Sequence, residues 1–519
     1  MLTTPVLLLG LISSAATPAP DEEATRTQAE AAIKQFEQFY ANKNQHVRKA
    51  AVMGLADCNH ELAVEPLIGA IADESTLVRD QVPLALARQS TSKAFVAMLR
   101  TLKTTRKVDI QLALLEAFKV TRPPLVYDTV LKLAAKGAFE TKIVTAELLG
   151  LLPQKGSRSE EALLALLDDK SPQIRLAAID SLGQLGSASL ADTCMRILVE
   201  DDDWRVRASC VDALAEFRLK ETIPPLISAM ESEEGRLQDD IHDALVQITG
   251  ELDQTADPQS WQKWWDRVGD RWEVPSKEEV ERRRKQRNAG DRQYAPALRK
   301  YTPFVGIETR SRRMLFLLDI SGSMADQLSM VGADAARIKA FKEQFGDYEH
   351  KIELAREHLI NTIATLPSYV KFNIITFHTD VKHWKKGLVA ANTGNKNNAI
   401  RFLARLTPSE LRNLSNSTQE AGRTNTFDVL NAAFRLTKKP TARPTKNHTV
   451  EADTAFLVTD GLPTAGRLTD PDELLRYFMT INRRTKMVFH CITFGYGNES
   501  LLKPIAETSS GQYLVITLE

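Results

Sequence analysis

Cysteine is scarce in this sequence, and no two of its cysteines form a C-x-x-C pair. The four residues, Cys58, Cys194, Cys210 and Cys491, are scattered along a chain of 519 residues. This spacing excludes a zinc ribbon and a scaffold that depends on dense disulfides. Cys194 and Cys210 are near enough in sequence to pair, but free thiols buried within helices are the favoured interpretation.

The sequence also lacks an excess of charge of either sign, because 67 Lys and Arg residues balance 67 Asp and Glu residues. Without a basic excess there is no reason to expect a nucleic-acid partner. The phosphate-binding pattern G-x-x-x-x-G-K-[ST] is missing, and no His stands in a recognisable catalytic motif. We therefore expect no enzymatic activity.

No apolar stretch is long enough to cross a bilayer as a helix, and the first one, Val6–Ile12, is short. Small residues at Ser14–Ala16 follow this apolar core, so we expect residues 1–20 to be a secretory signal. The stretch before the core has no Lys or Arg, and a wrongly assigned start or a frayed N-terminus are the alternatives. The expected location is secreted or periplasmic.

Residues 30–250 repeat with a period of 31 to 33 residues, and a chain of this length is expected to hold two or three domains. Seven apolar residues mark the repeat: Val47, Val78, Ile110, Ile143, Ile174, Val206 and Leu237. Seven residues after each lies a small residue, and eight residues after each lies a large apolar one. These positions share one helix face, which predicts paired amphipathic helices with close helix contacts.

Four of these residues are followed by arginine, as in Val47-Arg48 and Ile174-Arg175, and these pairs resemble short HEAT-type repeats. The resemblance implies an α-solenoid of about seven helix pairs. Two interpretations stay open for it. The solenoid is either a second protein-binding surface or a rigid spacer.

Residues 251–312 hold four of the six tryptophans and then a charged run. The segment Asp257–Trp265, with Trp272, is expected to seal the end of the solenoid core. The run from Lys277 to Arg287 predicts a solvated helical linker with pairs such as Glu278 with Arg282.

The stretch Met314–Met324 places hard oxygen donors directly after a buried strand. Five apolar residues lead into Asp319, Ser321 and Ser323, and Gly322 marks a tight turn. A carboxylate and two hydroxyls are donors that suit Mg²⁺, which takes few carboxylates and keeps waters. A capped strand-to-helix turn without metal is the alternative for this motif taken alone.

This D-x-S-x-S pattern resembles the metal-ion-dependent adhesion site of von Willebrand factor type A domains. Gly422–Phe427 resembles the second loop of that family, with Thr424 as its hydroxyl, and Phe456–Leu462 resembles the fourth strand, which ends at Asp460. The resemblance covers residues 313–519 and implies a doubly wound, mostly parallel α/β sheet.

The same resemblance implies a ligand set of Asp319, Ser321, Ser323, Thr424 and Asp460. The ion is expected to be Mg²⁺, or Mn²⁺ or Ca²⁺ in its place. In the family an open position on the ion takes an Asp or Glu side chain of a protein partner. Two competitors stay open, a binding module whose site only stabilises its loops, and a metal-dependent hydrolase.

Two segments of this domain look longer than the fold requires, Ala325–Tyr348 and Lys386–Gln419. Both are expected on the metal face, either selecting the partner or serving as plain insertions. His378 and His490 are expected to have packing or hydrogen-bonding roles rather than to bind metal. Together, the sequence predicts an exported protein with an N-terminal α-solenoid and a C-terminal type A domain for protein binding or adhesion.

Overall fold

The computed structural model describes residues 22–152, 157–290, 302–328, 335–417, 422–435, 451–495 and 498–517. The chain divides into two compact units, Met1–Val130 and Leu131–Glu519, and each is considered by itself. The expected secretory signal lies outside the described residues. Within the described ranges, no helix is both long and apolar enough to cross a membrane.

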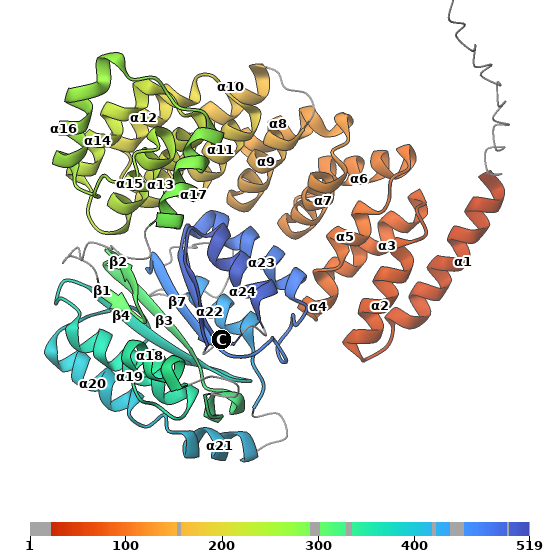
Figure 1. Ribbon diagram of the computed structural model, residues 1–519. Coiled ribbons are helices and arrows are strands. Elements are labelled where there is room, and N and C mark those ends of the chain that lie inside the picture. The colour runs from red at the N-terminus through yellow and green to blue at the C-terminus, as the bar shows by residue number, and fades with distance from the viewer. Residues whose placement is uncertain are drawn as a thin grey trace, which may run out of the picture. The chain divides into compact units, whose positions relative to one another are not determined.

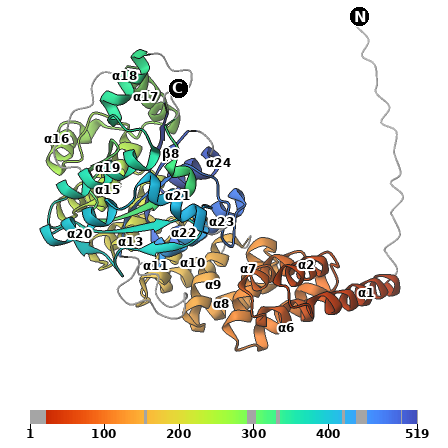
Figure 2. The same ribbon diagram turned by 90° about the horizontal axis from the view of Figure 1, so that it is seen from below.

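The first unit is a series of short helices in which α2 packs against α1 and α5 packs against α7. Figures 1 and 2 show these helices following one another along the unit. Their bounds are α1 (Glu22–Tyr40), α2 (Gln45–Ala56), α3 (Val64–Gly69), α4 (Thr76–Arg79), α5 (Val82–Ala87), α6 (Ser92–Thr104) and α7 (Val108–Thr121). Helix α8 (Tyr127–Lys136) crosses the boundary between the units.

The second unit begins with further helix pairs, in which α9, α11, α13 and α15 pack in series. Helices α10, α12 and α14 each contact the helix that follows them. Their bounds are α9 (Phe139–Leu151), α10 (Ser157–Leu166), α11 (Pro172–Leu185), α12 (Leu190–Glu200), α13 (Trp204–Phe217), α14 (Ile223–Ser232) and α15 (Arg236–Thr249). The predicted helical repeat is therefore present.

The marker residues of the sequence repeat fall in one helix of each repeat, from Val47 in α2 to Leu237 in α15, and these helices are α2, α4, α7, α9, α11, α13 and α15. Three of the four arginines that follow a marker, Arg48, Arg175 and Arg207, pair with an acidic residue just before the next such helix. Arg175 lies 2.7 Å from Asp201, and Arg207 lies 2.6 Å from Glu233. These pairs tie a repeat to the next one and give a reason for Arg to recur after the apolar residue.

The small residue of the repeat has its predicted role in one place and not in another. A Cβ added at Gly150 would lie 3.0 Å from Ser181 Cβ, so glycine allows α9 to approach α11 closely. At Gly54 the same addition would meet nothing within 4 Å. The prediction of close helix contact is therefore wrong for the repeat that contains Gly54.

The tryptophans close the end of the helical series. Trp261 and Trp264 on α16 (Pro258–Val268) are buried, and their rings meet edge to face at 5.6 Å. Trp261 Nε1 donates a hydrogen bond of 3.1 Å to His242 on α15. Since α16 also packs on α14, the structure agrees with the expected cap.

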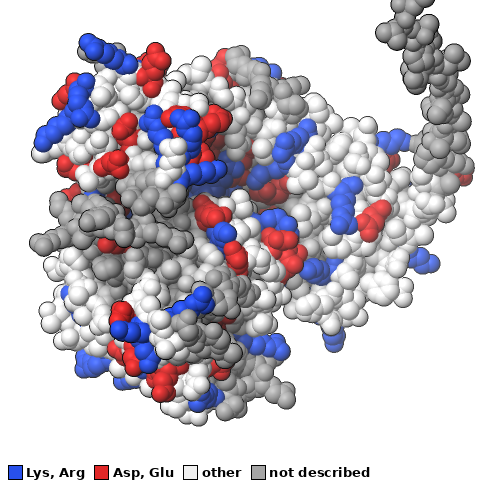
Figure 3. Space-filling view, viewed as in Figure 1, with Lys and Arg blue, Asp and Glu red and all other residues white. Residues whose placement is uncertain are grey.

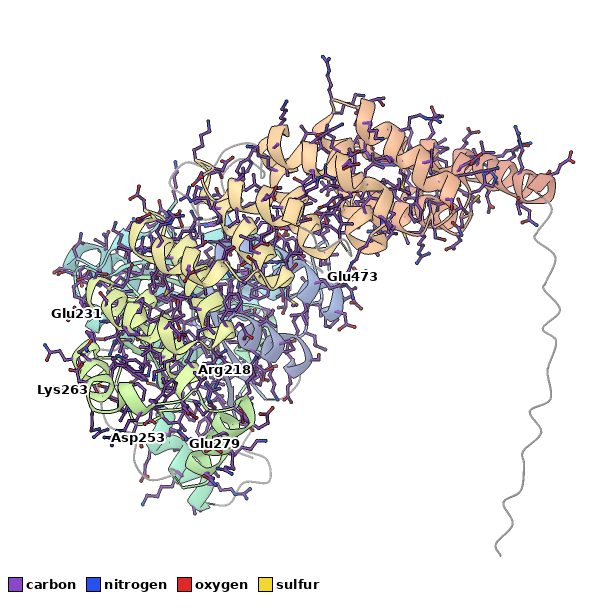
Figure 4. All side chains as sticks on the ribbon, turned by 90° about the horizontal axis from the view of Figure 1, so that it is seen from above. Arg218, Glu231, Asp253, Lys263, Glu279 and Glu473 are labelled. Carbon is purple, nitrogen blue, oxygen red and sulfur yellow. The ribbon has the colours of Figure 1, made fainter. Side chains whose placement is uncertain are left out.

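The charged run forms helix α17 (Lys277–Gly290), in which Glu279 rather than Glu278 pairs with Arg282 and Arg283. The expected pairing of Glu278 with Arg282 is replaced by this i,i+3 and i,i+4 arrangement. Arg218, at the end of α13, donates to the carbonyls of Gln247, Ile248 and Pro275 and so ties α17 to the solenoid. Figure 4 labels both Arg218 and Glu279.

The remainder of the second unit is built on a seven-stranded sheet in the order β5-β4-β3-β7-β8-β9, with β6 paired to β4. Strands β4, β3, β7, β8 and β9 are parallel, and β5 and β6 are antiparallel to β4. The bounds are β3 (Arg313–Asp319), β4 (Lys371–Phe377), β5 (Val381–His383), β6 (Val389–Ala390), β7 (Thr454–Thr459), β8 (Val488–Phe494) and β9 (Tyr513–Ile516). A separate hairpin pairs β1 (Thr302–Phe304) with β2 (Ile307–Thr309).

Helices cover both faces of this sheet, as the unbroken burial of β7 and β8 requires. One face packs with α18 (Ala335–Phe345), α19 (Lys351–Thr365), α20 (Thr393–Leu403) and α21 (Pro408–Ser417). The other packs with α22 (Thr426–Phe434), α23 (Pro471–Thr485) and α24 (Glu499–Thr508). The layers are visible in Figure 1. This confirms the predicted doubly wound, mostly parallel fold.

At the amino edge of the sheet, where β3, β7 and β8 begin, basic residues pair with acidic residues of the solenoid helices. Arg484, at the end of α23, lies 2.9 Å from Glu147 on α9. Arg483 lies 3.0 Å from Asp180 on α11. Arg236 on α15 donates to the carbonyl oxygens of Asp453 and Lys486, which precede β7 and β8.

An aromatic ring completes these contacts at the amino edge. The guanidinium groups of Arg236 and Arg313 lie 5.4 and 5.1 Å from the ring centre of Trp204 on α13. Burial alone would lower the pKa of the Lys486 ammonium, but the charges of Asp180 and Asp212 outweigh burial and raise it. The amino edge is therefore a set of paired charges within the second unit.

Candidate metal site

The two aspartates predicted as ligands follow neighbouring strands at the carboxyl edge of the sheet, where the parallel strands end. Asp319 ends β3, and Asp460 comes directly after β7. The parallel register pairs Leu318 with Val458, which brings these two strand ends side by side. From β3 the chain passes to β4 on one side and later returns to β7 on the other, so the site lies at a topological switch point.

Hydrogen-bonding contacts connect all five predicted site residues. Ser323 Oγ donates to Asp460 Oδ1 at 2.8 Å and lies 3.2 Å from Ser321 Oγ. The Ser321 backbone amide donates to Asp319 Oδ1 at 2.7 Å. Thr424 Oγ1 approaches Asp319 Oδ2 at 3.5 Å, a long contact that closes the set. The structure thus brings together residues up to 141 positions apart in the sequence.

The turn after β3 is shaped by its own side chains and backbone. Ser321 precedes the 3₁₀ helix Gly322–Ala325, and Asp319 and Ser321 are fully buried. The Asp319 carboxylate accepts from the Ser321 amide two residues on, which is the local bond that favours Asp at a tight turn. A strand ending in Asp-x-Ser therefore folds back and keeps its oxygens at the strand end.

The loop that carries Thr424 is locked to the loop after β7. Thr424 N donates to Thr464 Oγ1 at 2.9 Å, and Thr464 N donates to Thr424 O at the same distance. A Cβ added at Gly461 would lie 3.2 Å from Thr424 Oγ1, so glycine allows this close approach. Asn425 caps α22 by accepting from Asp428 N. These contacts fix the Thr424 hydroxyl beside Asp319.

The electrostatics of the site favour a cation. Burial raises the pKa of Asp319 to about 7, and the charge of Asp460 acts in the same direction, against hydrogen bonds from Thr459 and Ser321 that lower it. Two carboxylates at the same edge of a sheet repel each other, and a divalent ion between them would relieve that repulsion.

The donor set fits the hard-cation chemistry expected from the sequence. Two carboxylates and three hydroxyls offer oxygen only, as Mg²⁺ prefers. In the described part of the chain, no three His, Cys, Asp or Glu residues gather into a metal cluster. Any metal at this site would therefore depend on the hydroxyls of Ser321, Ser323 and Thr424.

Two residues of the site were not predicted from the sequence. Thr459 Oγ1 donates to Asp319 Oδ2 at 2.5 Å, and Lys351 Nζ lies 2.7 Å from Asp460 Oδ2. Thr459 is the last residue of β7 and precedes Asp460, so its place beside Asp319 follows once the strands are paired. For Lys351 the sequence offers only the start of a helix.

The two long segments both contact the turn after β3, but neither is a plain loop. The first segment carries α18. Near its start, Gln327 forms an antiparallel β-bridge with His350, which follows its end. The second carries β6, α20 and α21, and Arg412 on α21 donates to Ala325 O at 3.1 Å. Leu403 on α20 is fully buried in the core, so part of the second segment belongs to the helical layer.

The two histidines have structural contacts in this domain. His490 is buried in β8, stacks on Phe456 at 4.9 Å and accepts a hydrogen bond from Gln512 N. Burial lowers its pKa to about 4. His378 O accepts from Asn425 N at 3.0 Å. All four cysteines are free thiols, and Cys194, Cys210 and Cys491 are buried.

Comparison with protein families finds two families, one for the helical repeats and one for the domain with the parallel sheet. HEAT repeats match residues 33–119, 128–208 and 160–245. A von Willebrand factor type A domain matches residues 346–515. The second match includes Thr424 and Asp460 but begins after the turn that carries Asp319, Ser321 and Ser323.

Individual proteins are similar to part of the chain. Inter alpha-trypsin inhibitor, heavy chain 4 of Mus musculus is 25% identical over 206 residues, which are 40% of this chain and 18% of that protein. Inter-alpha-trypsin inhibitor heavy chain H4 of Homo sapiens is 26% identical over 191 residues, 37% of this chain and 16% of that protein. The chain thus spans less than a fifth of these relatives.

A solved structure of an aerotolerance-related membrane protein from Bacteroides fragilis is also similar. It shares 15% identity and covers 39% of this chain and 90% of its own, with a TM-score of 0.25. At this TM-score the likeness carries no argument.

Proposed function

Because residues 346–515 form a von Willebrand factor type A domain and HEAT repeats precede it, we propose that this chain binds protein partners through a divalent metal ion. The observation that carries the proposal is the connected set of five oxygen-bearing residues at the carboxyl edge of the sheet. The expected ion is Mg²⁺, with Mn²⁺ or Ca²⁺ as substitutes. The expected partner group is an Asp or Glu carboxylate.

Each residue of the site has a defined task in this proposal. Ser321, Ser323 and Thr424 hold the ion through hydroxyl oxygens, and Asp319 and Asp460 supply the negative charge. Bound there, the ion supplies an electrophilic centre for a partner carboxylate. Thr459 and the Ser321 amide orient Asp319 by hydrogen bonds of 2.5 and 2.7 Å. The site so arranged binds and does not transform its partner.

The HEAT repeats form the second interaction surface in this proposal. Part of the solenoid already contacts the amino edge of the sheet, through residues such as Glu147, Asp180 and Arg236. A second protein partner would therefore use other solenoid residues. Export as a secreted or periplasmic protein also belongs to the proposal.

The first test is calorimetric titration of Mg²⁺ and Mn²⁺ into the EDTA-stripped full chain. The wild type should bind one ion, and Ser321→Ala/Ser323→Ala should bind none. A matched control, Thr480→Ala/Thr508→Ala, removes two hydroxyls from exposed helical positions of the same domain and should bind like the wild type. Absence of binding by the folded wild type would sink the metal-dependent mechanism.

The second test asks what the loaded protein captures. A Glu-containing peptide library should be retained in Mg²⁺ and released by EDTA, and its Gln counterpart should not be retained. If EDTA does not release the retained peptides, a binding module that works without metal would be favoured. Metal-dependent turnover of a generic ester or phosphate would favour the hydrolase.

A further inference from the structure

Lys351 places a positive charge on one of the two carboxylates of the site. Its Nζ lies 2.7 Å from Asp460 Oδ2 and 3.4 Å from the carbonyl oxygen of Ser323. The Asp460 side chain is 1% exposed and that of Lys351 is 19% exposed. The Coulomb attraction between two charges this well shielded from water is stronger than that of a surface ion pair.

The backbone around Lys351 fixes its position. Lys351 is the first residue of α19, and His350 and Glu353 form a capping box at that helix start. Lys351 N donates to Asp326 O at 3.2 Å, and Leu328 N donates to Glu349 O at 2.8 Å. The start of α19 is therefore tied to the turn after β3, and this places the Lys351 ammonium beside Asp460.

The two carboxylates of the site differ in what neutralises them. Among the contacts of the described residues, Asp319 is met by neutral donors, Thr459 Oγ1, Thr424 Oγ1 and the Ser321 amide. Asp460 is met by the ammonium of Lys351 and by the hydroxyl of Ser323. An ion between the carboxylates would meet a competing cation on the Asp460 side.

We propose that Lys351 is the internal counter-cation of Asp460 and that a divalent ion binds in competition with it. The inference rests on the proposed function, since it concerns the affinity of the same site. A dication and an ammonium that share one carboxylate repel each other, and the coupling is reciprocal. Lys351 thus holds Asp460 in place without metal and sets the affinity below what the five ligands alone would give.

The experiment compares Mn²⁺ binding by the EDTA-stripped full-length wild type with that of Lys351→Met. Removing the charge should tighten binding by about tenfold, within the usual range of coupling between two sites. Lys351→Arg keeps the charge and should bind within about threefold of the wild type. The control Lys339→Met removes an exposed lysine of α18, in the first long segment, and should leave the affinity unchanged.

A second readout is thermal melting, which also shows whether each variant folds. In EDTA, Lys351→Met should melt below the wild type because Asp460 loses its counter-cation, and saturating Mn²⁺ should close that gap. Lys351→Gln serves in both measurements if the methionine variant does not fold. Equal or weaker Mn²⁺ binding by the neutral variants, with normal binding by the wild type, would overturn the role of Lys351 alone. No binding by any folded protein would overturn the proposed function and this inference with it.

Discussion

The two edges of the parallel sheet differ in how their charged groups are satisfied. At the amino edge, Arg483, Arg484 and Lys486 are paired with acids of helices α11, α9 and α13. At the carboxyl edge, the two aspartates accept hydrogen bonds from the hydroxyls of Ser323, Thr424 and Thr459, and Asp460 also pairs with Lys351. The charges at the amino edge are thus paired within the chain, whereas at the carboxyl edge Asp319 accepts hydrogen bonds from the neutral donors Thr459, Thr424 and the Ser321 amide.

This comparison teaches that charge alone does not mark a binding site. On the face of the molecule in Figure 3, basic and acidic side chains are interspersed over the described residues, as the zero formal charge of the sequence leads one to expect. What separates the two edges is the chemistry of the neighbours. Opposite charges at the amino edge make a contact within the protein, whereas neutral hydroxyls at the carboxyl edge donate to Asp319 without neutralising its charge.

The largest expected effect comes from breaking the amino edge. Arg484→Ala would remove an ion-pair partner of Glu147, whose side chain is 5% exposed, and breaking a buried ion pair in this way costs about 3 kcal/mol. Urea denaturation should show this loss. Arg476→Ala, at an exposed position of the same helix, should change the stability by less than about 0.5 kcal/mol. Equal effects of the two changes would remove the distinction between the edges.

An intermediate effect is expected at the carboxyl edge. Thr459→Val keeps the shape of the side chain but removes the hydrogen bond to Asp319, leaving a buried carboxylate oxygen less satisfied at a cost of about 2 kcal/mol. The loss should appear in denaturation measured in EDTA. The exposed control Thr480→Val should be close to neutral. An unaltered Thr459→Val protein would show that Asp319 does not need this donor.

The smallest expected effect is a pH dependence near the amino edge, at Asp239. Burial raises the pKa of Asp239 to about 7, with Asp243 and Asp240 acting in the same direction and Arg310 opposing them. The folded state then holds a proton that the unfolded state has lost, so stability falls as the pH rises from about 4 to about 7.

Asp239→Asn should reduce the stability difference between pH 5 and pH 7.5 by about 1 kcal/mol, well below the full shift because the side chain is 26% exposed. Denaturation curves at the two pH values measure this. Asp266→Asn, at an exposed position of α16, should keep the wild-type slope. A slope unchanged by Asp239→Asn would mean that Asp239 is ionised throughout this range.

Local patterns in the sequence were enough to predict the repeat helices, the buried strands and the turn after β3. Helix α19 begins at Lys351, just after the first long segment, because the apolar periodicity resumes there. The second long segment was predicted less well. Its Asn-rich stretch suggests a loop, but Asn392 caps α20 and the apolar Ala399 and Leu403 bury that helix.

The contacts that the sequence did not reveal join residues far apart in the chain. Thr459 and Asp319 are 140 residues apart, and Arg484 and Glu147 are 337 apart. The first contact depends on the pairing of β3 with β7, and the second depends on how α23 meets α9. No local pattern encodes either, so Lys351 could be predicted as a helix start but not as a neighbour of Asp460.

The register of β3 and β7 has a mechanical consequence. Each strand has a site residue at one end, Asp319 or Asp460, and an amino-edge residue at the other, Arg313 or Asp453. A partner pulling on the site would load both strands lengthwise and in the same direction, because both site residues lie at the carboxyl ends of parallel strands. The ladder between the strands would then not be peeled open bond by bond, and the load would pass along both strands to Arg313 and Asp453.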